Sequence, residues 1–164
     1  MAPSFRERLV WDAATGEVRD GAVRYMLIRP DALMTAFSAL PEDACRAVLE
    51  SFRKSIVTHG AKSAAKYQAQ LTASDPSLLA LVATTAPQLG WGIWRLTPEP
   101  DGFELQVDNS PFAQGFGPSA RPVCTPILGM LEAVSGLMGT PMALTEVACA
   151  ATGAACCRFQ ARRR

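Results

Sequence analysis

The sequence lacks a long hydrophobic run, a strong net charge and a signal peptide. No stretch of its 164 residues is apolar for the length that a membrane-spanning helix needs. The N-terminus carries Arg6, Glu7 and Arg8 where a secretory signal would be apolar. The formal net charge is +1, and the only basic run, Arg162–Arg164, is a short terminal tract. We therefore expect a cytoplasmic protein with no membrane span and no nucleic-acid partner.

The motifs of common cofactor-dependent enzymes are also absent. The chain has no G-x-G-x-x-G after a predicted strand and no P-loop, so no nicotinamide, flavin or nucleotide site is visible. It has a single histidine, His59, and no acid–base pair that the sequence places together. We assign no catalytic residue, and the sequence leans away from an enzyme.

The cysteines are the most informative residues present. A chain of this length fits one domain with a real core, and in the reducing cytoplasm its five cysteines favour metal binding or packing over disulfides. Cys124, Cys149 and Cys157, with the carboxylate of Glu146, have the composition of a closed tetrahedral zinc site. The alternative is a metal-free cluster, because cysteine also packs as a small hydrophobe and the spacing contains no C-x-x-C pair in this set.

The spacing of these residues sets conditions on a metal site. Cys149 and Cys157 flank a turn containing Gly153, so a hairpin can bring them together. Glu146 and Cys149 are three residues apart and would point to opposite faces of a regular strand. If both residues bind the same metal ion, the strand must bulge or end near Ala148. Cys156 would point away from Cys157 in an extended chain, so only one of the two should join the site.

Hydrophobic patterning predicts an α+β fold. The elements expected are a β-like run at 23–28, helices at 30–40, 45–67, 77–89 and 125–138, strands at 91–96 and 103–107, and a C-terminal hairpin of 142–149 with 157–161. Ser74 or Asp75 is expected to cap the third helix, and the Pro- and Gly-rich segment 109–121 is expected to be a loop. We expect an antiparallel sheet of about four strands, covered by helices on one face. Residues 1–22 would be an N-terminal extension and 23–162 the domain.

Several segments together resemble the 4-vinyl reductase domain family. They are, in order, Arg24–Phe37 (RYMLIRPDALMTAF), the helix after Leu40-Pro41, Leu89-Gly90-Trp91-Gly92, Asp108-Asn109-Ser110-Pro111-Phe112-Ala113, Pro122-Val123-Cys124, and Glu146-x-x-Cys149 to Cys157-Arg158-Phe159. Members of this family bind small molecules. They include sensor modules of aromatic-responsive bacterial transcription activators, archaeal hydrocarbon-binding proteins and proteins linked to bacteriochlorophyll synthesis, with a fold related to trafficking-complex (TRAPP) subunits.

The resemblance implies a structural zinc ion. In the sensor members the corresponding Cys, Glu, Cys and Cys hold zinc, and Cys124, Glu146, Cys149 and Cys157 fill all four positions here. Phenol-type sensors hold the ligand hydroxyl with a Trp and a His. Their Trp-x-Asn-Ser-like segment is Val107-Asp108-Asn109-Ser110 in this chain, so that Trp is missing and a phenol ligand is not implied.

A ligand site in such a domain needs an apolar cavity with a few polar groups. The candidates are aromatic and apolar residues near the predicted Gly-rich helix, together with the polar end of the long helix: His59, Tyr67, Trp91, Trp94, Phe112, Phe116, Met130 and Val134. Core packing is the alternative for each of them.

Three functions are compatible with these observations. The first is a stand-alone sensor or carrier domain for a small hydrophobic or aromatic molecule, which would pass its signal to a partner protein or through a homodimer. The second is a reductase or accessory factor acting on a vinyl tetrapyrrole, as the family name suggests. The third is a structural assembly module like the trafficking subunits. A stripe of small residues, Gly129, Ala133 and Gly136, favours a dimer or close contact with the long helix.

Overall fold

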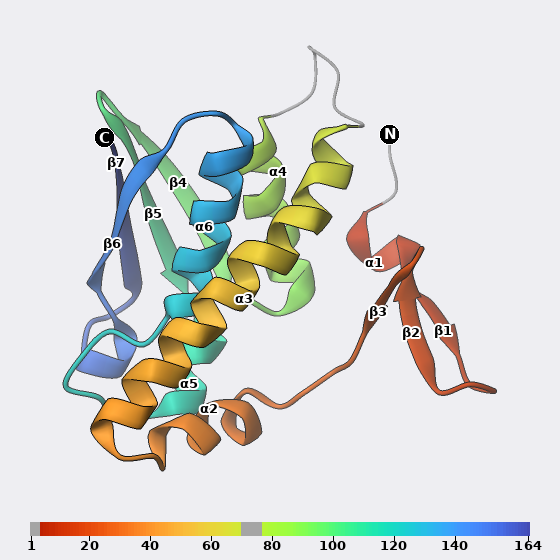
Figure 1. Ribbon diagram of the computed structural model, residues 1–164, viewed down its shortest axis with the longest axis horizontal. Coiled ribbons are helices and arrows are strands. Elements are labelled where there is room, and N and C mark those ends of the chain that lie inside the picture. Colours follow the sequence, from red (N-terminus) through yellow and green to blue (C-terminus); the bar gives the residue numbers. More distant parts are fainter. Residues whose placement is uncertain (1–3, 70–76) are drawn as a thin grey trace.

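The chain folds into two antiparallel sheets and a layer of helices. The computed structural model describes residues 4–69 and 77–164 (Figure 1). The larger sheet has four strands in the order β4-β5-β7-β6, and a smaller sheet of three strands has the order β1-β2-β3. In chain order the elements are α1 (Phe5–Arg8), β1 (Val10–Asp12), β2 (Glu17–Asp20), β3 (Val23–Tyr25), α2 (Pro30–Ser38), α3 (Glu42–Gln68), α4 (Leu78–Thr85), the 3-10 helix η1 (Ala86–Leu89), β4 (Ile93–Glu99), β5 (Gly102–Asp108), α5 (Pro111–Phe116), α6 (Thr125–Leu137), β6 (Met142–Ala148), the 3-10 helix η2 (Ala150–Thr152) and β7 (Cys157–Arg163).

The larger sheet confirms the predicted α+β architecture. Along β5, Phe103, Leu105 and Val107 are buried, while Glu104 and Gln106 between them are partly exposed. This alternation is typical of an antiparallel strand with one face against the core and one against solvent. Helix α6 covers the buried face, and α3 crosses α6 on its outer side (Figure 1).

The contact between α3 and α6 depends on a glycine. A Cβ atom at Gly129 would lie 2.6 Å from the carbonyl oxygen of Arg53, so a larger residue would push the helices apart. The hydroxyl of Thr125 donates to the carbonyl oxygen of Leu49 at 2.9 Å, which fixes the start of α6 on α3. At Gly136, in contrast, no described atom of another element lies within 4 Å of the Cβ position. At Gly129, therefore, the stripe of small residues serves packing within the chain.

The helix boundaries follow local rules for the most part. Pro30 occupies the first turn of α2 as predicted, and Gly90 ends η1 with a left-handed φ of 77°. The cap of α4 is Ser77, whose hydroxyl accepts from the backbone N–H of Ala80 at 3.3 Å. The expected caps Ser74 and Asp75 lie outside the described residues.

The prediction of a loop over 109–121 is wrong for its first half, where α5 forms. Pro111 sits in the first turn of α5, where a missing N–H costs nothing. Gly115 lies inside the helix because a Cβ atom there would be 2.3 Å from the carbonyl oxygen of Pro30. Close packing on α2 therefore explains a glycine that composition alone assigns to a loop.

The smaller sheet forms an N-terminal arm, residues 4–25, beside the end of α3 (Figure 1). The expected domain boundary after residue 22 falls between β2 and β3, which are paired from Asp20 with Val23 to Val18 with Tyr25. Met26 and Leu27, which lead from the arm to α2, are 77% and 83% exposed. Among the described residues, no helix is both long and apolar enough to cross a bilayer.

Candidate metal centre and ligand cavity

Four buried side chains from separate parts of the chain meet at one end of the larger sheet. Cys124 precedes the first residue of α6, Glu146 is on β6, Cys149 follows the end of β6 and Cys157 begins β7. One ligand atom from each lies within 4.8 Å of the other three. All three cysteines are completely buried, and Glu146 is 9% exposed. The structure thus brings together the four residues that the sequence proposed as metal ligands.

An irregularity in β6 makes this meeting possible. The pairing of β6 with β7 shifts register between Glu146 and Ala148, where the predicted bulge was needed. Beyond this shift the ligand atoms of Cys149 and Glu146 face the same point, and the chain then turns through η2. Cys156 is partly exposed, and Cys157 is the member of the adjacent pair that enters the cluster.

The sulfur spacing fits a shared tetrahedral ion better than a disulfide. The sulfur of Cys124 lies 3.9 Å from that of Cys149 and 3.6 Å from that of Cys157. A disulfide needs about 2.05 Å between sulfurs. Two thiolates on one zinc ion at about 2.3 Å each, at a tetrahedral angle, are about 3.8 Å apart. The geometry of the thiols therefore suits zinc.

The carboxylate of Glu146 is poorly satisfied by protein groups alone. Its Oε2 accepts from the backbone N–H of Cys124 at 3.0 Å, but its Oε1 has no hydrogen-bond partner among the described residues. Burial raises the pKa of Glu146 to about 9. Hydrogen bonds among the thiols raise the pKa of Cys124 and lower that of Cys157 to about 4. A divalent cation would provide the missing partner for Oε1 and favour the ionised form of every ligand.

Neutral donors, rather than arginines, surround the sulfurs. The Ser110 hydroxyl oxygen lies 3.2 Å from the Cys124 sulfur, and the backbone N–H of Ala150 donates to the Cys157 sulfur at 3.3 Å. Arg121 and Arg158 are the arginines nearest to the cluster residues in the sequence. Arg121 pairs with Glu42, and Arg158 lies 3.8 Å from Glu104 on the outer face of the sheet. Neither interaction involves the cluster.

A large apolar cavity lies between α3, the arm, η1 and the start of β4. Its volume is about 860 Å³. Most of the predicted ligand residues line it, namely His59, Tyr67, Trp91, Trp94, Phe112 and Met130. The ring centroids of Trp91 and Phe112 are 5.0 Å apart in an edge-to-face contact, and those of Phe52 and Phe112 are 6.3 Å apart, also edge to face. Aromatic edges therefore form the inner wall.

Two of the predicted ligand residues lie elsewhere. Phe116, one turn beyond Phe112 on α5, packs into the main core instead of lining the cavity. Val134, one turn beyond Met130 on α6, is 1% exposed and packs with Ala64 and Leu78. It borders a separate space of about 50 Å³. In both cases the helix leaves the cavity within one turn, and the space beyond is filled by neighbouring side chains.

The arm supplies cavity residues that sequence reasoning missed. Side chains from the arm and its connection to α2 line one side: Phe5, Leu9, Trp11, Val18, Val23 and Tyr25. Strands of three or four residues have too little periodicity to reveal a buried face. The one available sign in the sequence that the arm contributes to the cavity was Trp11, a large aromatic residue before a turn in a polar neighbourhood.

A polar cluster joins the arm to α3 next to the cavity. The hydroxyl of Tyr67 accepts from Arg8 Nη2 at 2.7 Å and donates to Asp20 Oδ2 at 3.2 Å. Arg8 also pairs with Asp20 at 3.1 Å, and its guanidinium lies over the Tyr67 ring, 5.0 Å from the centroid. Burial raises the pKa of Tyr67 to about 12, so its hydroxyl stays protonated near neutral pH. We name this set, Arg8, Asp20 and Tyr67, the arm latch.

Comparison with known proteins agrees with the family resemblance seen in the sequence. The family model of the 4-vinyl reductase domain matches residues 103–163, which confirms the resemblance drawn from the sequence. This match spans β5 to β7 and includes all four residues of the metal cluster. No curated protein matches the chain by sequence.

Solved structures share the fold at low sequence identity. The phenol-responsive sensory domain of the transcription activator PoxR, with phenol, has a TM-score of 0.78 and 20% identity, over 96% of this chain and 86% of that chain. A vinyl-4-reductase family protein from Methanocaldococcus jannaschii has a TM-score of 0.54 and 13% identity, over 69% of this chain and 68% of that chain. Trafficking protein particle complex subunit 3 from Naegleria fowleri, covalently bound to palmitic acid, has a TM-score of 0.59 and 13% identity, over 82% of this chain and 95% of that chain.

Proposed function

We propose that the chain is a zinc-stabilised domain that binds a small hydrophobic or aromatic molecule, in the role of a sensor or carrier. The observation that carries this proposal is the cavity of about 860 Å³, which is lined mainly by apolar and aromatic side chains. Ligand sites are typically apolar cavities of about 300–1,000 Å³ with a few polar groups. A solid core would have filled this space, because protein interiors are closely packed.

The solved relatives support the same function. One is a sensory domain with phenol, and another carries palmitic acid. Both ligands are apolar molecules with one polar end. The segment that resembles the phenol sensors has Val107 in place of a Trp, and Val107 is completely buried in the core. The proposal is therefore for an apolar ligand other than phenol.

Zinc has a structural role in this proposal. Cys124, Glu146, Cys149 and Cys157 provide four ligands, which complete a tetrahedral shell without an open position for substrate. The ion would tie the start of α6 to the β6–β7 hairpin. Such a site contributes on the order of 10 kcal/mol of apparent binding energy, coupled to folding. The thiols remain reduced in the cytoplasm, where we place the protein.

We also propose a homodimer, formed through the arm and the segment that connects it to α2. Trp11 is 62% exposed, and the adjacent residues Met26 and Leu27 are 77% and 83% exposed, which is unusual for large apolar side chains. A second copy would cover this surface, and a signal could pass between the two copies or to a partner protein.

Binding is tested by titrating purified protein with a panel of aromatic and aliphatic compounds. The environment-sensitive dye N-phenyl-1-naphthylamine serves as the reporter, and isothermal calorimetry gives affinities. We expect dye fluorescence to rise on binding and to fall as a panel compound displaces the dye. Absence of both dye binding and any calorimetric signal, with the fold intact, would reject the ligand-binding function and leave an assembly module.

A further inference from the structure

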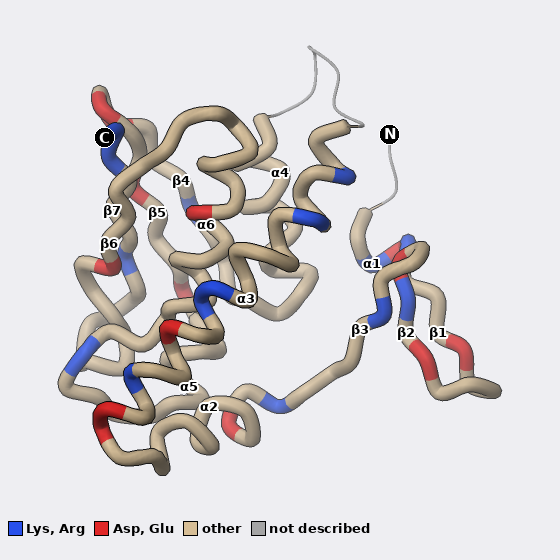
Figure 2. The backbone as a smooth tube through the Cα atoms, viewed as in Figure 1, with Lys and Arg blue, Asp and Glu red and all other residues tan. Residues whose placement is uncertain are grey.

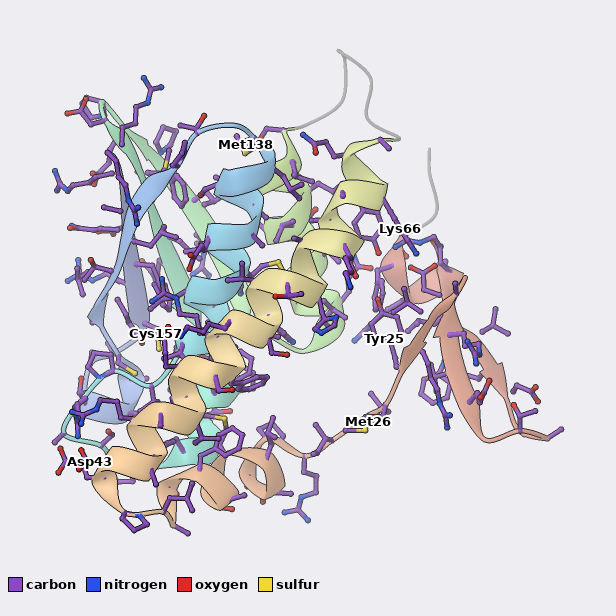
Figure 3. All side chains as sticks on the ribbon, in the orientation of Figure 1. Tyr25, Met26, Asp43, Lys66, Met138 and Cys157 are labelled. Atoms are coloured by element: carbon purple, nitrogen blue, oxygen red, sulfur yellow. The ribbon has the colours of Figure 1, made fainter. Side chains whose placement is uncertain are left out.

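The charged groups that line the cavity are all of one sign. Lys62 and Lys66 border it, with His59 beside them, and no Asp or Glu among the described residues does so. These three residues lie three or four positions apart on α3, so they share one helix face. Ser63, between them, adds a hydroxyl to the same face. Figure 3 shows Lys66 at the end of α3 that lies beside the arm.

The two lysines make no ion pair with any described residue. By contrast, Lys54, two turns earlier on α3, lies 3.9 Å from Glu50. Asp20, the acidic residue of the arm that reaches α3, is already engaged by Arg8 and Tyr67. Figure 2 shows that the second half of α3 carries positive residues without a neighbouring acidic one on the helix. Among the described residues, therefore, no acidic group pairs with the positive charges at this end of the cavity.

The size of the cavity sets the scale of the ligand. An apolar cavity of about 150 Å³ is enough for benzene. The volume here, about 860 Å³, is several times larger. A single aromatic ring would leave most of the aromatic wall formed by Trp91, Trp94 and Phe112 without a contact. A molecule with several rings or a long chain would reach that wall from the lysine end.

We propose that the ligand is an amphipathic organic anion, with a carboxylate held by Lys62 and Lys66 and a large apolar body directed toward Trp94, Phe112 and Met130. This deepens the proposed function and rests on it. Two lysines attract a carboxylate more strongly than a neutral hydroxyl, because charge-assisted hydrogen bonds are about twice as strong as neutral ones. Selection among apolar molecules would then depend on their charge.

The test compares two ligands that share a chain and differ in charge, dodecanoate and dodecanol. Each is used below its micellar concentration to displace N-phenyl-1-naphthylamine. The wild-type protein should bind dodecanoate about tenfold more tightly than dodecanol at low ionic strength. The Lys62→Met/Lys66→Met double variant should lose this preference and bind dodecanol with unchanged affinity. Methionine keeps an unbranched stem, and both positions are exposed, so folding should persist.

Lys54→Met is the matched control, because Lys54 is an exposed lysine of the same helix that does not line the cavity. It should keep the full preference for dodecanoate. If the wild type binds dodecanoate and dodecanol equally, the anion inference is overturned and the ligand-binding function stands. The same conclusion follows if the double variant keeps the preference for dodecanoate. Failure of both compounds and the dye to bind would reject the ligand-binding function itself.

Discussion

The hydroxyl oxygen of Ser110 lies 3.2 Å from the sulfur of Cys124. Asn109, just before it, adopts a left-handed φ of 55°, which turns the chain out of β5 toward the metal cluster. Pro111 and Phe112, the next residues, line the cavity. One short segment therefore contacts the candidate metal centre on one side and the candidate ligand site on the other.

Zinc should be present and required for stability. We expect about one equivalent of zinc per chain in protein purified without added metal, because the cluster matches tetrahedral geometry. Cys149→Ser should unfold or aggregate the protein, whereas Cys45→Ser, outside the cluster, should be mild. Elemental analysis and thermal melts with and without a chelator measure both effects. Less than about a tenth of an equivalent in a well-folded protein would contradict the zinc assignment.

The Ser110 contact should couple the metal centre to the cavity. Ser110→Ala should lower the free energy of unfolding by about 1 kcal/mol, since it removes one buried hydrogen bond. It should also weaken dye binding, because α5 loses an anchor. Ser119→Ala, which removes an exposed contact to the Arg121 N–H, is the control and should change neither quantity. Urea unfolding and dye titration give the two values, and an unchanged dye affinity in Ser110→Ala would argue against coupling.

Phe112 should behave as a cavity wall rather than as solid core. Phe112→Ala should cost less stability than Phe159→Ala, because one side of Phe112 faces the cavity while Phe159 is completely buried. We expect about 3 kcal/mol for Phe112→Ala and up to about 5 kcal/mol for Phe159→Ala. Only Phe112→Ala should also reduce ligand affinity at temperatures where it stays folded. Equal losses of stability in the two variants would mean that no void adjoins Phe112.

The arm latch should hold the arm against α3. Tyr67→Phe keeps the ring in the cavity wall but removes the hydroxyl that bonds to Arg8 and Asp20. We expect a loss of about 1–2 kcal/mol in local stability of the arm, seen as faster amide hydrogen exchange over residues 5–25. Arg46→Gln, which breaks an exposed ion pair with Asp43 on the same helix, is the control. If both variants exchange at the wild-type rate, the latch does not hold the arm.

Exposed apolar residues of the arm and of its connection to α2 should mediate dimerisation. Light scattering at micromolar concentration should give the mass of a dimer for the wild type. Leu27→Asp places a charge at a position that is 83% exposed in the single chain, so it should yield a monomer without unfolding it. A wild-type monomer at every concentration tested would rule out the dimer.

Local sequence patterns were sufficient to predict much of the fold. Apolar residues at three- and four-residue steps predicted α3, and alternation predicted the buried face of β5, because each depends only on the geometry of one element. Composition and the family resemblance named the cysteine and glutamate set. The condition that β6 must bulge also followed from sequence spacing, since residues three apart cannot share a face of a regular strand.

Tertiary structure decided what depends on contacts between distant segments. Gly115 and Gly129 are explained only by the backbone of α2 and α3 that approaches them. Contacts of Arg8 and Asp20 with Tyr67 help to hold the arm beside the cavity, and these pairs are 59 and 47 residues apart. The sequence by itself determined the candidate metal ligands and the local form of most elements. Only folding brought Ser110 to the metal cluster and the lysines to an apolar cavity, because packing between elements, and not propensity within them, sets those distances.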